Sequence, residues 1–524
     1  MDLNHLGLWM VGMSAGIPLL NALRTRSRPA RGCLVVWLLL LSVVGFGWLL
    51  FRDQAGLIAG GLWLVFMLVP LLGTRMVARA IEQQRYPRAR RIARLLSILH
   101  PADGWREQPD FLRATELAFN GDLAGATSLL LRVERSDPAR ARVARTQILR
   151  MQGDWDALSD LTAQFTDADF RAEPALIPTY LRALGECIGP DAVARGYLRF
   201  EPLLSTPQAA SLGEMSRLFL FAFAGRRPLL DSLLRGPLSH YPDSVKRFWL
   251  ATSDLAAGRP ATALVELEKL RDAPDALARQ GVERRLSRSL PGSASSLSAE
   301  SRVLLDRLAR RLDEESRFGD RASATASRPT ATLVIIALLC LVFAVEILEG
   351  GAENPETLNA LGGLWPPSVL DGDWWRPLTC TFLHFGVLHL VMNCFGLWVL
   401  GPFVERALGR VRFSIVYLLS AVAGPILAVA LYKYRGGQPG FLVGASGGIM
   451  GFVGATAAVL IRGWHKEKSE TALRRLPSIG LLILVQVAFD LSTPQVSFLA
   501  HTTGLITGFL VALPMQTRRG ALQG

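Results

Sequence analysis

Long apolar runs lie in two blocks along the chain, and a more polar stretch separates the blocks. The first block contains three runs and the second contains six, at about residues 6–23, 33–51, 56–77, 331–349, 378–401, 412–432, 441–461, 478–492 and 498–515. A helix of about 20 apolar residues spans the hydrocarbon core of a bilayer. The pattern therefore predicts an all-α fold with nine membrane-spanning helices, three before the polar stretch and six after it.

Composition and charge point to the same class of protein. Half of the 524 residues are hydrophobic and 19% are charged, which is too apolar for a soluble protein of this size. The formal net charge of +13 is concentrated in arginines beside the apolar runs, as at residues 24–31 and 85–94, which marks cytoplasmic loops. We therefore expect a multi-pass membrane protein with no nucleic-acid partner, whose N-terminus and loop 352–375 face outward. The high Ala, Arg and Leu content suggests a bacterial plasma membrane.

The polar stretch, residues 78–322, has apolar residues at helical spacing and predicts a soluble α-helical domain. A loose repeat runs through it, with glycines 32, 36, 36 and 33 residues apart at Gly121, Gly153, Gly189, Gly225 and Gly258. In four of the five copies an Ala follows four or five positions later. This period resembles that of tetratricopeptide-type helix pairs, and the alternative is an irregular helical bundle in which glycines end helices. The repeat interpretation predicts a groove for a protein partner or for self-association.

These patterns divide the chain into five segments. We predict a membrane block at 1–77, a cytoplasmic helical-repeat domain at 78–322, a linker at 323–330, a six-helix membrane domain at 331–515 and a short tail at 516–524. The five cysteines are scattered and show neither a disulfide framework nor a CxxC metal motif, so we expect them to be reduced. No phosphate-binding glycine loop is visible either, and we expect no cofactor.

Candidate chemistry comes from polar residues inside the second block, where polar groups are costly and therefore functional candidates. They are His384, His389, Asn393, Ser446, Asp490 and His501. Ser446 lies in Gly-Ala-Ser-Gly-Gly and His501 in Ala-His-Thr-Thr-Gly, and such small-residue faces let two helices approach closely. A serine nucleophile needs a base within hydrogen-bond reach, which an imidazole can supply. We expect Asp490 to be a hydrogen-bonded interfacial residue, with control of substrate access as the alternative.

Depth in the membrane can be estimated by counting from the basic clusters. Ser446 precedes Arg462 by 16 residues and His501 precedes Arg518 by 17, so both lie about 24 to 26 Å above the cytoplasmic boundary at about 1.5 Å per residue. This is the outer half of the bilayer, where water can reach a hydrolytic site. His389 and Asn393, four residues apart on one helical face, can supply two donors to an oxyanion.

Four motifs in order resemble those of the rhomboid family of intramembrane serine proteases, over about residues 331–515. They are Trp375-Arg376, His384 with His389-x-x-x-Asn393, Gly444-x-Ser446-Gly447, and His501-x-x-Gly504-x-x-x-Gly508. The resemblance implies that Ser446 is the nucleophile and His501 the general base of a dyad without an aspartate. It also implies an oxyanion hole formed by His389, Asn393 and the Ser446 backbone N–H, and substrates that are transmembrane helices cleaved near their outer ends.

The resemblance assigns supporting roles to further residues. Arg376 and Glu405 match positions that support the outer loop and the inner end of the second span, and Trp375 belongs to the same loop motif. We expect His384 to fix the second span or its loop by hydrogen bonding, and Gly444, Gly447, Gly504 and Gly508 to permit close packing. Many members place an aromatic ring four residues after the nucleophile, where this chain has Met450, whose sulfur can pack against the imidazole.

Other functions fit the sequence less well. A zinc site would need Cys, Asp or Glu at short spacing from the histidines, and we expect no metal. A transporter would show broken helices in two repeated halves, whereas these two blocks have three and six runs. The alternative that remains is a catalytically weak or inactive relative that binds transmembrane clients.

Overall fold

The computed structural model describes residues 3–25, 31–99, 105–106, 108–136, 138–206, 209–319, 329–436, 440–493 and 496–517. Within these residues the chain is helical, and the extended pairing it contains is a single antiparallel bridge between Leu364 and Leu442. The prediction of an all-α polytopic membrane protein is thereby confirmed. Most of the predicted linker at 323–330 and of the tail at 516–524 lies outside the described residues.

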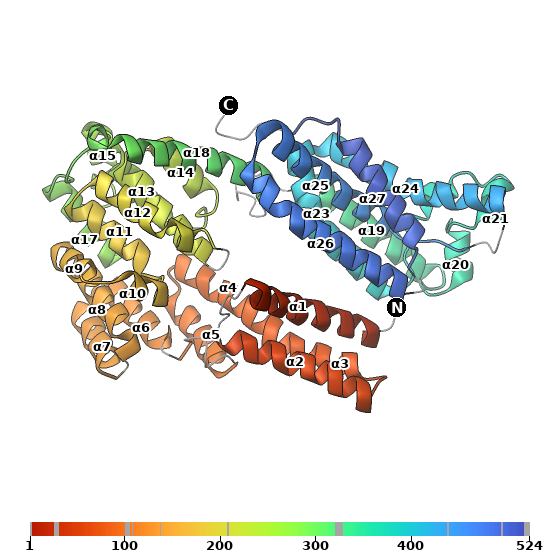
Figure 1. The fold of residues 1–524 in the computed structure, drawn as a ribbon, viewed down its shortest axis with the longest axis horizontal. Coiled ribbons are helices and arrows are strands. Elements are labelled where there is room, and N and C mark those ends of the chain that lie inside the picture. Colours follow the sequence, from red (N-terminus) through yellow and green to blue (C-terminus); the bar gives the residue numbers. More distant parts are fainter. Residues whose placement is uncertain are drawn as a thin grey trace. The chain divides into compact units, whose positions relative to one another are not determined.

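The chain forms two compact units, Asp2–Ala309 and Arg310–Gly524 (Figure 1). The first unit therefore holds the N-terminal apolar helices together with most of the polar helical stretch. The boundary falls inside α18 (Ala299–Phe318), and the residues of this helix from Arg310 onward pack with the second unit. There Arg317 pairs with Glu467 at 2.7 Å, and Phe318 lies against Gly463.

Helices occur at all nine positions where we predicted spans. They are α1 (Leu3–Thr25), α2 (Arg31–Leu50), the continuous α3 (Ala55–Trp63), η1 (Leu64–Leu68) and α4 (Val69–Glu82), then α19 (Thr330–Leu348), α23 (Val387–Leu408), α24 (Arg410–Arg435), α25 (Ser446–Glu467), α26 (Glu470–Ser492) and α27 (Phe498–Ala512). Among the described residues, seven helices are long and apolar enough to cross a bilayer, namely α2, α3 to α4, α19, α23, α24, α25 and α26. The chain is thus a multi-pass membrane protein, while the number of nine spans stays a prediction.

In the N-terminal block, α1 and α3 touch along their backbones. A Cβ on Gly7 would lie 2.1 Å from the carbonyl oxygen of Gly56, so both positions require glycine. The Asn4 side chain closes this contact, because its Oδ1 accepts from the Gly56 N–H at 2.6 Å and its Nδ2 donates to the Arg52 carbonyl at 3.1 Å. The π-helical turn η1 precedes Pro70, whose ring removes a backbone donor and disturbs the regular helix ladder.

The polar stretch folds into a succession of short helices. They are α5 (Tyr86–Leu99), α6 (Gln108–Phe119), α7 (Leu123–Ser136), α8 (Pro138–Gln152), α9 (Trp155–Ala163), α10 (Asp167–Ala172), α11 (Leu176–Cys187), α12 (Pro190–Leu204), α13 (Ala210–Phe223), α14 (Arg227–Arg235), α15 (Asp243–Ala256), α16 (Pro260–Glu268), α17 (Ala276–Ser287), the 3₁₀ turn η4 (Ala294–Ser296) and α18. Every glycine of the predicted repeat lies in a turn between two of these helices, with φ between +66° and +126°. This left-handed conformation is the one that glycine adopts at no steric cost. Each copy is therefore a helix pair, and the kinship with tetratricopeptide repeats stays a prediction.

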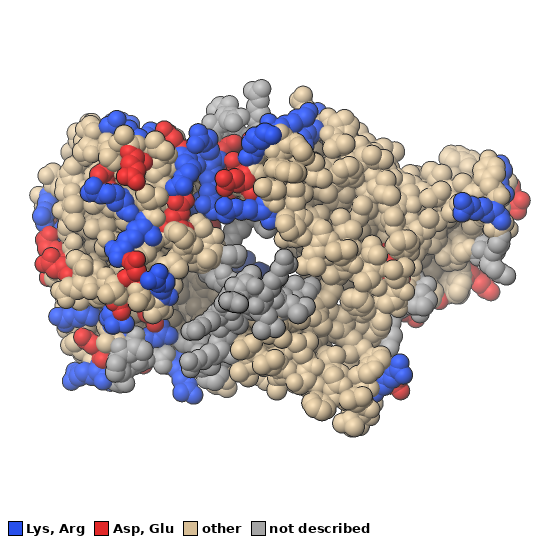
Figure 2. All heavy atoms as spheres, in the orientation of Figure 1, with Lys and Arg blue, Asp and Glu red and all other residues tan. Residues whose placement is uncertain are grey.

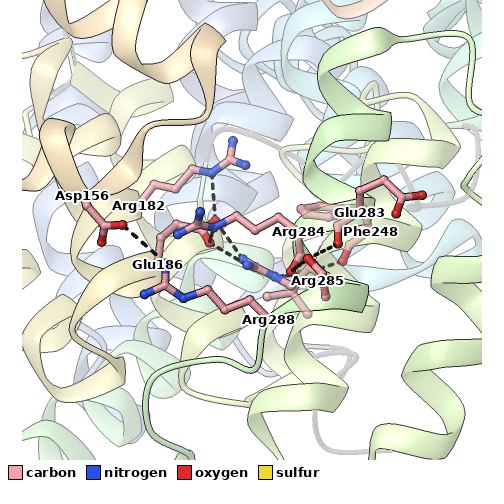
Figure 3. Close-up of polar contacts among 10 residues, drawn as sticks. Asp156, Arg182, Glu186, Phe248, Glu283, Arg284, Arg285 and Arg288 are labelled. Carbon is pink, nitrogen blue, oxygen red and sulfur yellow. Dashed lines mark hydrogen bonds and ion pairs between the residues drawn. The ribbon is translucent and has the colours of Figure 1, made fainter.

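A buried ion pair ties together helices that are far apart in the sequence of this unit. Glu186 on α11 accepts from both terminal nitrogens of Arg285 on α17 at 2.6 and 2.8 Å, and both side chains are at most 3% exposed (Figure 3). Arg182 lies within ion-pair distance of the same carboxylate and stacks on the ring of Trp155. These arginines hold the pKa of Glu186 below its usual value despite its burial, which alone would raise it.

In the second unit, α25 is the central helix. Of the residues in the apolar stretch of α25, 78% are buried inside the protein, compared with 11% in α26 and 17% in α19. This helix packs against α23, α24, α26 and α27. The outer helices expose large apolar side chains such as Leu341, Phe395 and Leu484. In Figure 2 the charged residues of this unit gather toward its two ends, which leaves an uncharged surface between them. Such a surface suits lipid.

Three short helices precede α23, of which the first two lie in the loop predicted at 352–375 and the third follows it directly. They are α20 (Pro355–Ala360), α21 (Pro366–Leu370) and α22 (Arg376–Thr379). This loop is pinned to the segment before α25, because Leu364 and Leu442 exchange backbone hydrogen bonds at 3.0 and 3.1 Å. The loop therefore holds in place the backbone segment that leads to Ser446.

Candidate active site

Ser446 is the first residue of α25, and it is half-buried. The first N–H groups of a helix have no partner within the helix and carry its positive dipole end. The chain reaches this position through Gly444, whose φ of +128° favours glycine and whose N–H donates to the Cys380 carbonyl at 2.9 Å. The hydroxyl of Ser446 is thus placed at a helix end suited to hold a developing negative charge.

The helix that carries His501 lies directly against α25. A Cβ on Gly504 would lie 2.2 Å from the Gly447 carbonyl oxygen, and one on Gly508 would lie 2.0 Å from that of Gly451. Ala500, the neighbour of His501, lies against Gly447, the neighbour of Ser446. The small-residue faces expected from the sequence therefore do meet, and they bring the Ser446 and His501 segments together.

His501 is buried, with 7% of its surface exposed, and its Nδ1 faces a carboxylate. The two oxygens of Asp490, near the end of α26, lie 3.0 and 2.9 Å from this nitrogen. Gln486, one turn earlier on α26, donates its Nε2 to Asp490 Oδ1 at 2.7 Å and lies 3.4 Å from His501 Nδ1. Asp490 is itself 6% exposed, so its carboxylate is hydrogen-bonded by Gln486 and His501 rather than by bulk water.

His389 and Asn393 lie one turn apart on α23 and face the segment before Ser446. A Cβ on Gly444 would lie 2.8 Å from His389 Nε2 and 3.8 Å from Asn393 Nδ2. The Phe385 N–H points at His389 Nδ1 at 3.3 Å, so this nitrogen accepts and Nε2 carries the proton of the neutral ring. The Asn393 Nδ2 is buried and has no hydrogen-bond partner in the described structure. Two donors thus converge on the same small space, and buried donors of this kind are rare unless a function uses them.

The remaining supporting residues lie around this centre. His384 is fully buried, its N–H donates to Glu346 on α19 at 3.0 Å, and its ring packs edge-on against His389 at 5.1 Å between centroids. Met450 is 7% exposed and joins the core cluster around α25. Trp375 is 44% exposed in the loop before α22.

Arg376 and Glu405 each hold a backbone segment in place. Arg376 donates from Nη1 to the carbonyls of Asn359 and Gly363 at 2.9 and 2.8 Å, and its Nε pairs with Asp373 at 2.7 Å. Glu405, buried near the end of α23, accepts from the N–H groups of the first turn of α19 at 2.9 Å. An acidic group at a helix N-terminus is stabilising, so Glu405 fixes where α19 begins.

The sequence interpretation did not pair Asp490 with His501. It placed the aspartate at the interface and described a serine and histidine dyad without an acid. The signal available in the sequence was weak, because the two residues are 11 apart on different helices and only the turn after α26 decides whether they meet. Among the described residues, no group of three or more His, Cys, Asp or Glu side chains could hold a metal ion.

Comparison with known proteins identifies one domain of the chain. Residues 371–518 match the Rhomboid domain, a span that contains Ser446, His501, His389 and Asn393. The chain therefore contains a region that matches the Rhomboid domain. This confirms the resemblance drawn from the four sequence motifs. The family match begins after α21, so α19, α20 and α21 and all of the first unit lie outside it.

Curated relatives of the rhomboid domain come from bacteria, plants and a parasite. The chain is 34% identical over 200 residues to Rhomboid protease GluP of Bacillus subtilis, which is 38% of this chain and 37% of the relative. It is 37% identical over 177 residues to the mitochondrial RHOMBOID-like protein 6 of Arabidopsis thaliana, covering 32% of this chain and 55% of the relative. Rhomboid-like protease 3 of Toxoplasma gondii is 29% identical over 184 residues. The chain thus spans about half or less of the length of the first two relatives.

Proposed function

We propose that this rhomboid protein is an intramembrane serine endopeptidase in which Ser446 is the nucleophile and His501 the general base. The observation that supports the proposal is the close crossing of α25 and α27 at Gly447 and Ala500, which are the chain neighbours of Ser446 and His501. The buried, unpartnered Nδ2 of Asn393 beside Gly444 supports an oxyanion hole at the same place.

The reaction follows from these positions. The Oγ atom of Ser446 bonds to the scissile carbonyl carbon while His501 takes the proton of the Ser446 hydroxyl. The resulting oxyanion is held by His389, Asn393 and the Ser446 N–H. When the C–N bond breaks, His501 gives the proton to the leaving nitrogen, and an ester remains on Ser446. Water then attacks the ester with His501 as base, which releases the new carboxylate and regenerates the hydroxyl.

The substrates in this proposal are transmembrane helices cleaved near their outer ends. A helix must unwind before its carbonyl carbon can reach Ser446, so Gly or Pro near the cut should favour cleavage. The basic loops support a topology in which the active site opens outward and the helical domain lies in the cytoplasm, in a bacterial plasma membrane.

The helical domain is the proposed site for a protein partner. Between its helices lies a cavity of about 170 Å³ whose charged lining consists of Arg150, Arg182, Arg284 and the single acid Glu186. This excess of positive charge supports an acidic partner group. In cells, the charge-reversed variant Arg150→Glu should then alter which substrates are cleaved, while a generic substrate is still cleaved. Unchanged substrate selectivity would contradict the proposed acidic partner.

The enzymatic proposal is tested by cleavage of a generic single-span substrate in liposomes. The wild type should cleave, and Ser446→Ala and His501→Ala should each abolish cleavage while keeping the thermal unfolding temperature. A control substitution at Ser414→Ala, a half-buried serine whose hydroxyl donates to the Arg410 carbonyl, should leave the rate unchanged. If the folded wild type binds several substrates but cleaves none of them, the protein is instead a client-binding relative.

A further inference from the structure

A carboxylate faces the proposed general base from a helix to which no catalytic role has been given. Asp490 lies 2.9 Å from Nδ1 of His501, and its side chain is 2% exposed. An ionised carboxylate inside a membrane domain is costly unless it is paired and hydrogen-bonded. Asp490 meets both conditions through His501 and Gln486, so the three side chains form one network.

The geometry fixes which imidazole nitrogen carries the proton. An ionised carboxylate can only accept, so the nitrogen facing it, Nδ1, must donate. In the neutral ring Nε2 is then left without a proton, on the side of the ring away from α26. This is the tautomer that can take a proton from a serine hydroxyl, and a carboxylate in this place also stabilises the imidazolium that forms.

Among the described residues of the helices packed around His501, Asp490 is the charged side chain that contacts its ring nitrogen. Residues 446–461 of α25 contain no titratable side chain, and residues 413–431 of α24 contain only the phenol of Tyr417. His389 on α23 carries an imidazole, which cannot supply a carboxylate. Asp490 is therefore the one acid among these groups that can orient the ring.

We propose that Asp490 is a positioning residue for His501, held in place by Gln486, so that this rhomboid protein works with a triad of acid, base and nucleophile rather than with a dyad. The inference rests on the proposed protease function. Asp490 does not touch the substrate and does not take up a proton. It acts through the tautomer and orientation of His501.

Three substitutions at Asp490 separate positioning from packing. Asp490→Asn keeps the shape, but its amide N–H can donate to Nδ1, which selects the wrong tautomer. We expect kcat to fall by at least about 10²-fold with KM within about twofold. Asp490→Ala leaves the tautomer free and should lose less than the asparagine variant. Asp490→Glu keeps a carboxylate and should retain at least about ten times the activity of the asparagine variant.

A purely structural role predicts the opposite order, because the uncharged isosteric Asn is then the mildest change. The measurement is kcat and KM of the full chain in liposomes, with thermal unfolding recorded for each variant and Glu470→Gln, an exposed acid at the start of α26, as the matched control. Activity of the asparagine variant within threefold of wild type, or above that of the alanine variant, overturns the proposal. If the Asp490→Asn variant does not fold, the proposal is overturned when the Asp490→Glu variant is no more active than the Asp490→Ala variant. Loss of the proposed function itself would appear separately, as a wild type that does not cleave.

Discussion

At the scale of single residues, the site depends on donors that are placed before any substrate arrives. Asn393 keeps a buried amide without a partner, and His389 presents Nε2 toward the same glycine. A group left unsatisfied inside a protein costs roughly 1 to 3 kcal/mol. In the proposed reaction that cost is recovered when an oxyanion forms, which lowers the barrier of the acyl-transfer step.

Asn393→Ala should therefore separate activity from stability. We expect kcat to fall by about 10²- to 10³-fold with little change in KM, since the donor acts mainly in the transition state. The thermal unfolding temperature should stay the same or rise, because a buried amide without a partner is removed. Steady-state kinetics and calorimetry on the same preparation check both. A kcat within threefold of wild type would remove Asn393 from the oxyanion hole.

Cys187 of the helical domain gives a prediction that depends on pH. Burial, followed by a hydrogen bond to Asp156 and the charge of that carboxylate, raises the pKa of this thiol to about 12. The thiolate is the reactive form, so at pH 8 its fraction is roughly a thousandfold lower than for an ordinary thiol. Alkylation by iodoacetamide, followed by mass spectrometry, should be correspondingly slow and should accelerate only as pH approaches 12. A rate within tenfold of that in the denatured chain would contradict the raised pKa.

At the scale of elements, the crossing of α25 and α27 brings together the helix segments that carry the proposed nucleophile and the proposed base. Its closeness comes from glycines on both helices, because the absence of side chains lets backbone meet backbone. Van der Waals packing is a main source of helix association inside a bilayer, so these contacts stabilise the bundle as well as the site.

Gly504→Ala should lower both the stability of the helix bundle and the rate of cleavage. The added methyl would lie 2.2 Å from the Gly447 carbonyl oxygen, so α27 must move away from α25. Overpacking of this kind costs about 1 to 3 kcal/mol, and a displaced His501 should reduce cleavage at least tenfold. Thermal unfolding and cleavage rates test this. The control is Gly480→Ala on α26, where a Cβ meets nothing within 4 Å, and equal behaviour of the two variants would argue against the close crossing.

At the scale of the whole molecule, sequence patterns anticipated the elements better than the contacts between them. The nine apolar runs and five glycine turns were visible because each depends on local spacing. Ser446 and His501 stood out because polar groups are rare in apolar runs. The pairs Asp490 with His501 and Glu186 with Arg285 were not predicted, since each joins two helices whose approach depends on the tertiary fold.

The proposed orientation in the membrane can be tested by labelling in intact cells. In a chain without its native cysteines, Asp371→Cys in the outer loop should react with an impermeant maleimide, because the basic clusters hold the other side in the cytoplasm. Lys466→Cys, in the basic last turn of α25, should react only after permeabilisation. Both residues are exposed, so access to the side chain does not limit labelling. The reverse pattern would invert the topology.

The most direct test of the central claim is covalent labelling of the folded full chain with a serine-directed fluorophosphonate, followed by peptide mass spectrometry. We predict a single adduct on Ser446, formed by the wild type and lost in His501→Ala, because the hydroxyl needs the imidazole to become a nucleophile. A folded wild type that forms no adduct, or one whose adduct lies on another serine, would contradict the assignment of Ser446 as the nucleophile.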